Sequence, residues 1–318
     1  MADAAELSEA KRALLEKYLK GNVIPTPLPV QPVLPHLPET PRPKMVEIDE
    51  RAPIVSVQKG GSKRPFFFLH GDWTDNAFFC FPLARDLGAE QPFYVLEPYK
   101  FEGLETPPTT EVMAAAHIKA IRSIQPHGPY MLGGFCNGGL IAYEMARQLH
   151  AQGEKTDLLV LMDSIPARLA SWRKAIHRIG TYTHLNTSKE LDWFLRIRHS
   201  YKFMQLSAER RSEDMQHLKK IDAKLGKITA PTPLLRLDYP GMFTWATASY
   251  EPGYYPGKVT LFWDEAEPFR KAWWDIMAKG KDAEVEEHII PGTHLSCRTD
   301  HLPGMAQHLR DCIEKIKM

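Results

Sequence analysis

Short runs of apolar and β-branched residues alternate along this chain with longer stretches of helical periodicity. Several of the runs are apolar throughout, which is typical of strands buried on both faces of a parallel sheet. The strand candidates are residues 54–58, 66–69, 92–96, 130–132, 157–162, 234–237, 258–263 and 284–290. The helical candidates, with apolar positions three to four residues apart, are 78–87, 110–124, 140–149 and 303–317. Strands and helices in this alternation predict a doubly wound α/β sheet with helices on both faces.

The alternation is interrupted between about residues 167 and 230. Residues 188–201 and 207–225 have helical spacing, are rich in basic and aromatic side chains, and have no strand candidate between them. We therefore expect a helical lid inserted into an α/β domain of residues 51–318. A helical subdomain with a purely structural role would give the same pattern.

Two appendages precede that domain. Residues 1–22 predict one amphipathic helix, with Leu14, Leu15 and Tyr18 near one face and Gly21 as its C-terminal stop. Prolines then recur every two or three residues, so residues 23–50 predict an extended, semi-rigid linker. The helix either packs on the body of the domain or serves as a docking element.

Composition narrows the class of protein. The 318 residues are 43% hydrophobic and 25% charged, with a net charge of +1, which gives no electrostatic reason to expect nucleic acid or an anionic membrane as partner. No apolar run approaches the roughly 20 residues of a membrane span, and the first residues lack the order of a signal peptide. The four cysteines lack metal-ligand or disulfide spacing, so we expect no metal, free thiols and a reducing cytoplasm.

The strongest chemical motif is Gly134-x-Cys136-x-Gly138, between the strand candidate that begins at Tyr130 and the helical stretch that begins at Leu140. This is the spacing of a nucleophile elbow, with Cys where Ser is usual. A strand that turns at once into a helix strains the central residue and leaves no room for side chains two positions away. The helix N-terminus favours a thiolate. A glycine-rich turn around a structural cysteine is the alternative.

A thiol nucleophile needs a base, and the base needs an orienting carboxylate. In a sheet of this kind such groups lie after the carboxyl ends of strands. His294 follows the last strand candidate and Asp163 follows the strand after the elbow helix, whereas Asp264, after the penultimate strand, is the rival acid. His288, within a strand, and His301, at the start of the closing helix, are poorer bases.

The remaining site residues concern the oxyanion and the acyl group. The backbone N–H of Asn137 and one from the loop after residues 66–69, at Asp72, should form the oxyanion hole. Trp73 in that loop is a candidate for the acyl channel or for packing. Aromatic residues of the expected lid predict an apolar acyl pocket, unless they form its core. They include Trp193, Phe194 and Phe203.

From about Arg64 to its C-terminus the chain resembles the thioesterase domains that close nonribosomal peptide and polyketide synthases, which have an α/β-hydrolase fold. The resemblance rests on the motifs at residues 65–71, 125–134, 142–146, 159–164, 250–257 and 291–294. In that family the acid lies about 27 residues past the nucleophile, which is the separation between Cys136 and Asp163. The resemblance thus favours Asp163 over Asp264. It implies a covalent acyl-enzyme, loaded from the phosphopantetheine arm of an acyl or peptidyl carrier protein, and no cofactor of its own.

The chain departs from the family pattern at several positions. Cys136 replaces Ser, Asn137 replaces a bulky apolar residue or Met, and the entry loop reads His-Gly-Asp-Trp from His70 instead of a glycine-rich run. No carrier or condensation domain precedes the region of resemblance. We therefore expect the enzyme to be a separate polypeptide that acts on a partner's thioester. Because an acyl-Cys keeps thioester reactivity toward amines, we expect acyl transfer or cyclisation with a small-molecule acceptor more than hydrolysis. The alternatives are an editing thioesterase that hydrolyses stalled carrier thioesters and a non-catalytic carrier-docking protein.

Overall fold

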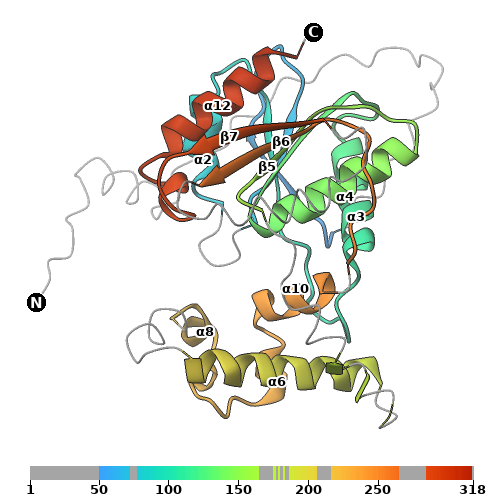
Figure 1. Ribbon diagram of the computed structural model, residues 1–318, viewed down its shortest axis with the longest axis vertical. Helices are drawn as coiled ribbons and strands as arrows, with labels where there is room; N and C mark the ends of the chain where they lie inside the picture. The colour runs from blue at the N-terminus through green and yellow to red at the C-terminus, as the bar shows by residue number, and fades with distance from the viewer. Residues whose placement is uncertain are drawn as a thin grey trace, which may run out of the picture. The chain divides into compact units, whose positions relative to one another are not determined.

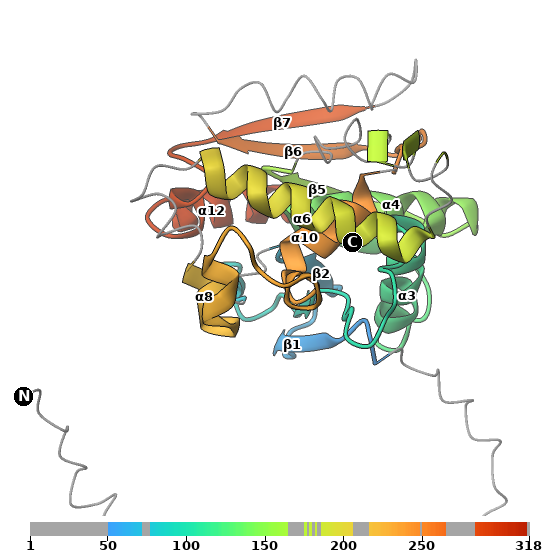
Figure 2. The same ribbon diagram turned by 90° about the horizontal axis from the view of Figure 1, so that it is seen from below.

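In the computed structural model, seven strands form one sheet in the order β1-β3-β2-β4-β5-β6-β7 (Figure 1). The strands are β1 (Ile54–Gln58), β2 (Phe66–Leu69), β3 (Phe93–Leu96), β4 (Tyr130–Phe135), β5 (Thr156–Met162), β6 (Val259–Asp264) and β7 (Val285–Ile290). Only the β1–β3 pair is antiparallel within the described chain. The sheet is therefore mostly parallel, as expected, with β1 at one edge and β7 at the other (Figure 2).

The structure describes residues 50–71, 77–164, 175–176, 178–179, 182, 186–205, 216–248, 250–264 and 284–316. All of these belong to one unit, Val46–Met318. The predicted N-terminal helix at residues 1–22 lies outside the described residues, as do nearly all of the predicted linker, Asp72 and Trp73. No helix of the described part is both long and apolar enough to cross a membrane.

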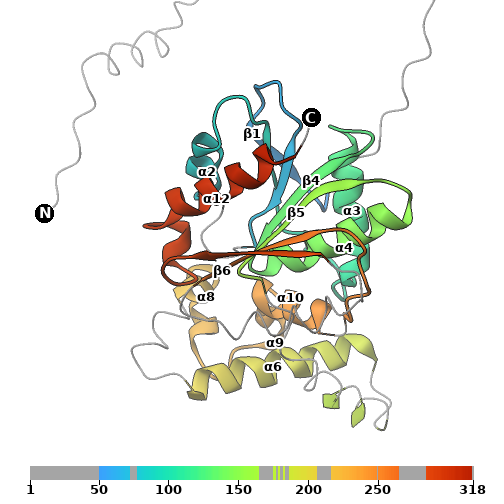
Figure 3. The same ribbon diagram turned by 45° about the horizontal axis from the view of Figure 1, so that its top comes forward.

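Helices cover both faces of the sheet (Figure 3). They are α2 (Cys80–Asp86), α3 (Thr110–Arg122), α4 (Asn137–Ala151) and α12 (Leu302–Glu314). Successive side chains of a strand point to opposite faces, so β4 contributes Leu132 to one core cluster and Met131 to the other. The first cluster includes α3 and α4, and the second includes α2 and α12. The predicted apolar runs are buried because both faces are covered.

The order of the strands reverses at β4. The later strands β5, β6 and β7 follow on one side of it in chain order, whereas β2, β3 and β1 lie on the other side. A crevice forms outside the carboxyl ends of parallel strands at such a reversal, and ligands of open α/β sheets bind there. Cys136 directly follows β4 at this point.

The chain between β5 and β6 is helical wherever it is assigned to an element. It includes α6 (Thr187–Gln205), α8 (Gln216–Ile221), the 3₁₀ helix η1 (Ala223–Gly226), α9 (Thr232–Leu235) and α10 (Tyr239–Thr247). The strand predicted at residues 234–237 is wrong, because a proline in the first turn starts α9 there. Three leucines around Arg236 form a segment too short to distinguish a strand from a buried helical turn. The helical segment therefore continues past residue 230, to Thr247.

Candidate active site

Cys136 lies in a strained turn between β4 and α4. Its φ of 52° and ψ of −122° are unusual for a residue with a side chain. The backbone N–H of Cys136 donates to the carbonyl oxygen of Met162 at 2.9 Å, so the turn is tied to the end of β5. This is the geometry expected of an elbow. The thiol is half-buried.

The glycines after Cys136 are required by the closeness of neighbouring strands. A Cβ atom on Gly138 would lie 2.4 Å from the carbonyl oxygen of Leu69 in β2. A Cβ atom on Gly139 would lie 1.8 Å from Oγ of Ser164, the second residue after β5. Both distances are far below van der Waals contact. Only glycine therefore allows α4 to begin this close to the sheet.

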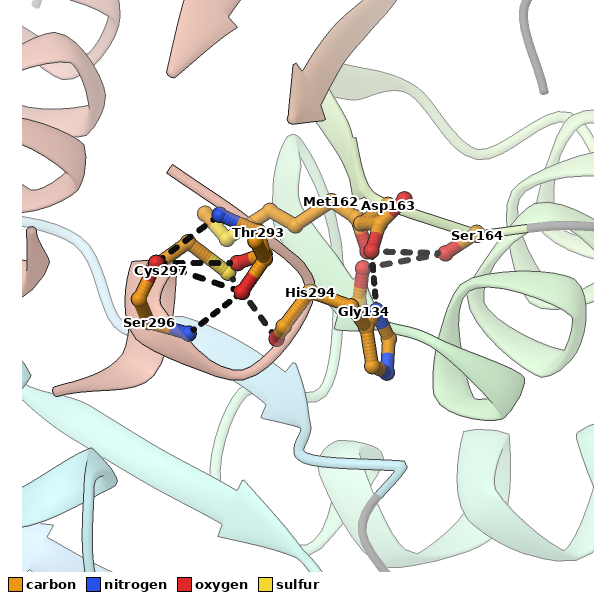
Figure 4. Close-up of polar contacts among 8 residues, drawn as sticks. All are labelled: Gly134, Met162, Asp163, Ser164, Thr293, His294, Ser296 and Cys297. Atoms are coloured by element: carbon orange, nitrogen blue, oxygen red, sulfur yellow. Dashed lines mark hydrogen bonds and ion pairs between the residues drawn. The ribbon is translucent and has the colours of Figure 1, made fainter. Parts of the chain in front are cut away.

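His294 and Asp163 meet beside the elbow (Figure 4). Nδ1 of His294 is hydrogen-bonded to the carboxylate of Asp163, and the side chain of Cys136 lies close enough to the imidazole to raise its pKa. Asp163 is buried, has a φ of 46°, and its backbone N–H donates to the carbonyl oxygen of Phe262 at 2.7 Å. The structure therefore brings together the three residues predicted as nucleophile, base and acid.

These contacts change the protonation of His294. Burial lowers its pKa, but the interactions with Asp163 and Cys136 outweigh burial and raise the pKa to about 10. The imidazole therefore holds its proton strongly between a carboxylate and a sulfur. Such a group can transfer a proton to and from a reacting atom next to Cys136.

A short loop after β7 holds His294 in place (Figure 4). The backbone N–H of Thr293 donates to Oγ of Ser296 at 2.8 Å, and the thiol of Cys297 donates to the carbonyl oxygen of His294 at 3.3 Å. Gly292 before it has a φ of 97°, a conformation that residues with side chains rarely adopt. The loop therefore turns sharply, and hydrogen bonds hold it at Thr293, before the histidine, and at the carbonyl group of His294 itself.

An aromatic ring lies against the imidazole. The ring of Phe135 stacks on His294 with centroids 4.9 Å apart and planes 27° from parallel. The guanidinium carbon of Arg298 lies 5.5 Å from the centroid of the Phe135 ring and 5.8 Å from that of Phe79. Burial lowers the pKa of Arg298. No motif in the sequence pointed to Phe135 or Arg298, because the fold brings Phe135 against His294 and Arg298 against Phe135.

Asp264, the rival acid, lies next to the same histidine. It ends β6, is buried, and its carboxylate lies within 4.8 Å of both the Asp163 carboxylate and a ring nitrogen of His294. The side chains of Asp163, Asp264 and His294 are thus close enough to hold a cation in principle. The hydrogen bond from His294 Nδ1, however, goes to Asp163.

The other predicted site residues are less closely grouped. Asn137 is the first residue of α4, and its N–H belongs to the unpaired donors of a helix N-terminus. Gly71, which ends the described part of the preceding loop, abuts the elbow: a Cβ atom on it would lie 1.8 Å from the carbonyl oxygen of Phe135. That loop thus reaches the turn around Cys136, whereas Asp72 and Trp73 themselves lie outside the described residues.

The predicted substrate-binding aromatics all lie on α6. Trp193 is exposed, whereas Phe194 is buried against Trp245 of α10 with ring centroids 5.3 Å apart. Phe203 is half-buried and lies near His199, with ring centroids 6.4 Å apart. Phe194 therefore joins helices within the inserted segment. Contact of these residues with a substrate stays a prediction.

Comparison with known proteins gives a matching family model and similar sequences. The model of the family described as "Thioesterase domain" matches residues 80–313. The chain is 26% identical over 292 residues to "Atromentin synthetase invA5" of Paxillus involutus, a match that covers 84% of this chain and 29% of the synthetase. It is 36% identical over 126 residues to "Inactive atromentin synthetase invA3" of the same organism, covering 39% of this chain and 13% of that protein. The chain thus spans less than a third of these relatives' length.

Among solved structures, the fold is similar to the NocB thioesterase domain in a covalent complex with a fluorophosphonate nocardicin G analogue. The TM-score is 0.54 and the identity 18%, covering 82% of this chain and 99% of that domain. It is also similar to part of the four-domain nonribosomal peptide synthetase AB3403, with a TM-score of 0.55 and 22% identity, covering 81% of this chain and 20% of that one. These structures support the α/β-hydrolase-like fold.

Proposed function

Since this chain belongs to the thioesterase domain family, we propose that it releases an acyl group from a thioester through a covalent intermediate on Cys136. The observation that carries the proposal is the arrangement of Cys136 beside His294, whose imidazole is hydrogen-bonded to Asp163. A nucleophile, a base within hydrogen-bond reach and a carboxylate that orients the base are the parts that acyl transfer requires.

The proposed first step loads the enzyme. His294 takes the proton of the Cys136 thiol, the resulting thiolate attacks the thioester carbonyl, the carbon–sulfur bond of the substrate breaks, and His294 donates the proton to the departing thiolate. Asp163 stabilises the imidazolium and holds its orientation. The N–H of Asn137, with one from the loop that follows Gly71, at Asp72, would hold the oxyanion. In the second step an acceptor attacks the acyl-Cys, His294 takes the acceptor's proton, and the Cys136 sulfur departs.

A sulfur nucleophile affects which acceptor the acyl group is transferred to. Loading exchanges one thioester for another and is close to isoergic, and the acyl-Cys remains reactive toward amines. We therefore propose transfer or cyclisation, with an amine or hydroxyl as acceptor, over hydrolysis. An editing thioesterase that delivers the acyl group to water is the second candidate, since the same residues serve both reactions.

The source of the acyl group follows from the relatives. One is named as an atromentin synthetase, another as an inactive atromentin synthetase, and one solved structure as a nonribosomal peptide synthetase. We propose that the substrate is a natural-product intermediate held as a thioester on the phosphopantetheine arm of an acyl or peptidyl carrier protein, in the cytoplasm. The chain itself would then need no cofactor.

Intact-protein mass spectrometry of the full chain tests this proposal. A panel of acyl-pantetheine thioesters would be added with and without amines to the wild type, Cys136→Ala, Cys136→Ser and a control, Cys80→Ala, at a free cysteine outside the candidate active site. We expect an acyl adduct on the wild type and the control that persists in water and is discharged by an amine. Fast conversion to the free acid would identify a hydrolase. An adduct that persists in Cys136→Ala, or none on any folded variant, would contradict the covalent mechanism and leave a carrier-docking role.

A further inference from the structure

Three side chains that the proposed reaction does not use converge between β7 and α12. Nε2 of His288 lies 3.2 Å from Oε1 of Glu286 and 3.5 Å from Sγ of Cys312. One ligand atom from each of the three residues lies within 4.8 Å of those of the other two. Both close contacts involve the same imidazole nitrogen. A nucleophile–base–acid relay would use the two ring nitrogens separately, so this cluster is not a second triad.

The separations match those of ligands around one metal ion. With Zn–N and Zn–O distances of about 2.0–2.2 Å and Zn–S of about 2.3 Å, tetrahedral ligands lie roughly 3.4 Å apart for nitrogen and oxygen and roughly 3.6 Å apart for nitrogen and sulfur. The observed distances, 3.2 and 3.5 Å, are close to these values. Thiolate, imidazole and carboxylate are also the donors that zinc prefers.

The fold presents these donors from two rigid elements. Alternation along β7 leaves Glu287 and Ile289 exposed and places Glu286 and His288 on the other face. Cys312 is buried on α12, and His308 precedes it by one helical turn, on the same side of the helix. The His308 ring lies with its centroid 5.1 Å from that of His288. A fourth donor therefore lies beside His288 and one helical turn from Cys312.

Two lysines form ion pairs with the carboxylate of Glu286. Nζ of Lys258 lies 2.9 Å from Oε2 of Glu286, and Nζ of Lys315 lies 2.7 Å from Oε1. A cation bound through Oε1 would displace Lys315, whose side chain is 60% exposed and free to turn into solvent. Lys258 can keep its contact with Oε2, which orients the carboxylate as an outer partner of a metal ligand does.

The cluster is separate from the candidate active site. Glu286 and Cys312 line a cavity of about 310 Å³ together with residues from the start of β5 and β6. His294, by contrast, follows the carboxyl end of β7, four residues after Ile290. We propose that Glu286, His288 and Cys312, with His308 as fourth ligand, form a zinc site that joins α12 to β7. This departs from the absence of a metal expected from the spacing of the cysteines.

Cobalt, which absorbs visibly when bound by thiolate, serves as the probe. Co²⁺ would be titrated into metal-free full-length Cys136→Ala, which removes the active-site thiol. We expect one equivalent to give a sulfur-to-cobalt charge-transfer band that Zn²⁺ abolishes. Adding Cys312→Ser should remove the band, and adding His288→Gln should weaken binding more than about 100-fold, since loss of an outer-shell partner alone costs about 10- to 100-fold.

The control is His127→Gln. His127 contacts Glu154 at the same 3.2 Å but is 86% exposed and has no sulfur in that pair, so cobalt affinity should not change. Circular dichroism would show that each variant is folded, and Cys312→Ala would replace Cys312→Ser if it is not. A band that survives removal of Cys312, or no band at all in the folded Cys136→Ala protein, would overturn the proposal.

Discussion

Nδ1 of His294 and the carboxylate of Asp163 are hydrogen-bonded although 131 residues separate them in the chain. The bond joins the loop after β7 to the residue that follows β5. Asp264, at the end of the intervening β6, lies within 4.8 Å of the same pair. Residues that end or follow three neighbouring parallel strands thus meet at one point. This point lies at the carboxyl ends of the strands, where Cys136 also follows β4.

This geometry predicts which carboxylate matters for acyl loading. In Asp163→Asn the amide cannot stabilise the imidazolium of His294, so the loading rate should fall about 10³- to 10⁴-fold. The left-handed backbone at residue 163, with a φ of 46°, is one that Asn tolerates well. The loss should therefore appear in stopped-flow measurements of thiol release from an acyl-pantetheine thioester without a loss of fold.

Asp264→Asn is the matched control, because Asp264 is buried in the same cluster, whereas the hydrogen bond of His294 Nδ1 is to Asp163. We expect it to lower the loading rate less than about tenfold, which corresponds to a rise of less than about 1.4 kcal/mol in the activation free energy. A larger loss in Asp264→Asn than in Asp163→Asn would assign the acid to Asp264 instead.

The raised pKa of His294 predicts how stability depends on pH. The pKa is about 10 in the folded protein, against an ordinary value of 6.5. Stability from this group is therefore fully present below about pH 6.5 and is lost as pH rises toward 10, at up to about 1.4 kcal/mol per pH unit. Urea unfolding between pH 6 and 9 should show a steeper decline for the wild type than for His294→Gln. Parallel curves for the two proteins would contradict the assignment.

Much of the site follows from local signals in the sequence. The spacing of Gly134, Cys136 and Gly138 predicts an elbow because such a turn excludes side chains, and the structure shows how closely Leu69 and Ser164 approach it. The positions of Asp163 and His294 could be inferred because the carboxyl ends of parallel strands share one edge of a sheet.

The rest depends on contacts between distant segments. Residues 234–237 contain three leucines around Arg236, but a proline in the first turn and burial of Leu235 place Leu234 and Leu235 at the end of the short helix α9. His288 and Cys312 are 24 residues apart, without the short spacing of a metal motif, and only the packing of α12 on β7 brings them together. The stacking of Phe135 on His294 likewise has no counterpart in any sequence pattern.

The start of α4 gives a prediction about packing. In Gly139→Ala the new Cβ atom would lie 1.8 Å from Oγ and 2.5 Å from Cβ of Ser164, so something must shift. We expect a loss of about 1–3 kcal/mol in the free energy of unfolding, measured with urea. Adding Ser164→Gly removes both clashing atoms and should recover part of that loss.

Gly304→Ala is the matched control for this experiment, because it lies in α12 and a Cβ atom there would have nothing within 4 Å. Alanine at that position should be neutral or should stabilise by up to about 1 kcal/mol. Equal destabilisation by the two alanines, or no recovery with Ser164→Gly, would show that contact with Ser164 is not what requires glycine at residue 139.

A buried carboxylate joins α4 to the segment that follows α10. Glu144 is fully buried and accepts hydrogen bonds from Arg147 at 2.8 and 3.0 Å, Gln148 at 2.8 Å and the hydroxyl of Tyr250 at 2.7 Å. Tyr250→Phe removes one donor and should cost about 1–3 kcal/mol of unfolding free energy, because the carboxylate stays buried with the others. Tyr254→Phe, at an exposed tyrosine, should change it by less than about 0.5 kcal/mol. Denaturation that does not distinguish these two variants would show that the bond to Tyr250 adds nothing to stability.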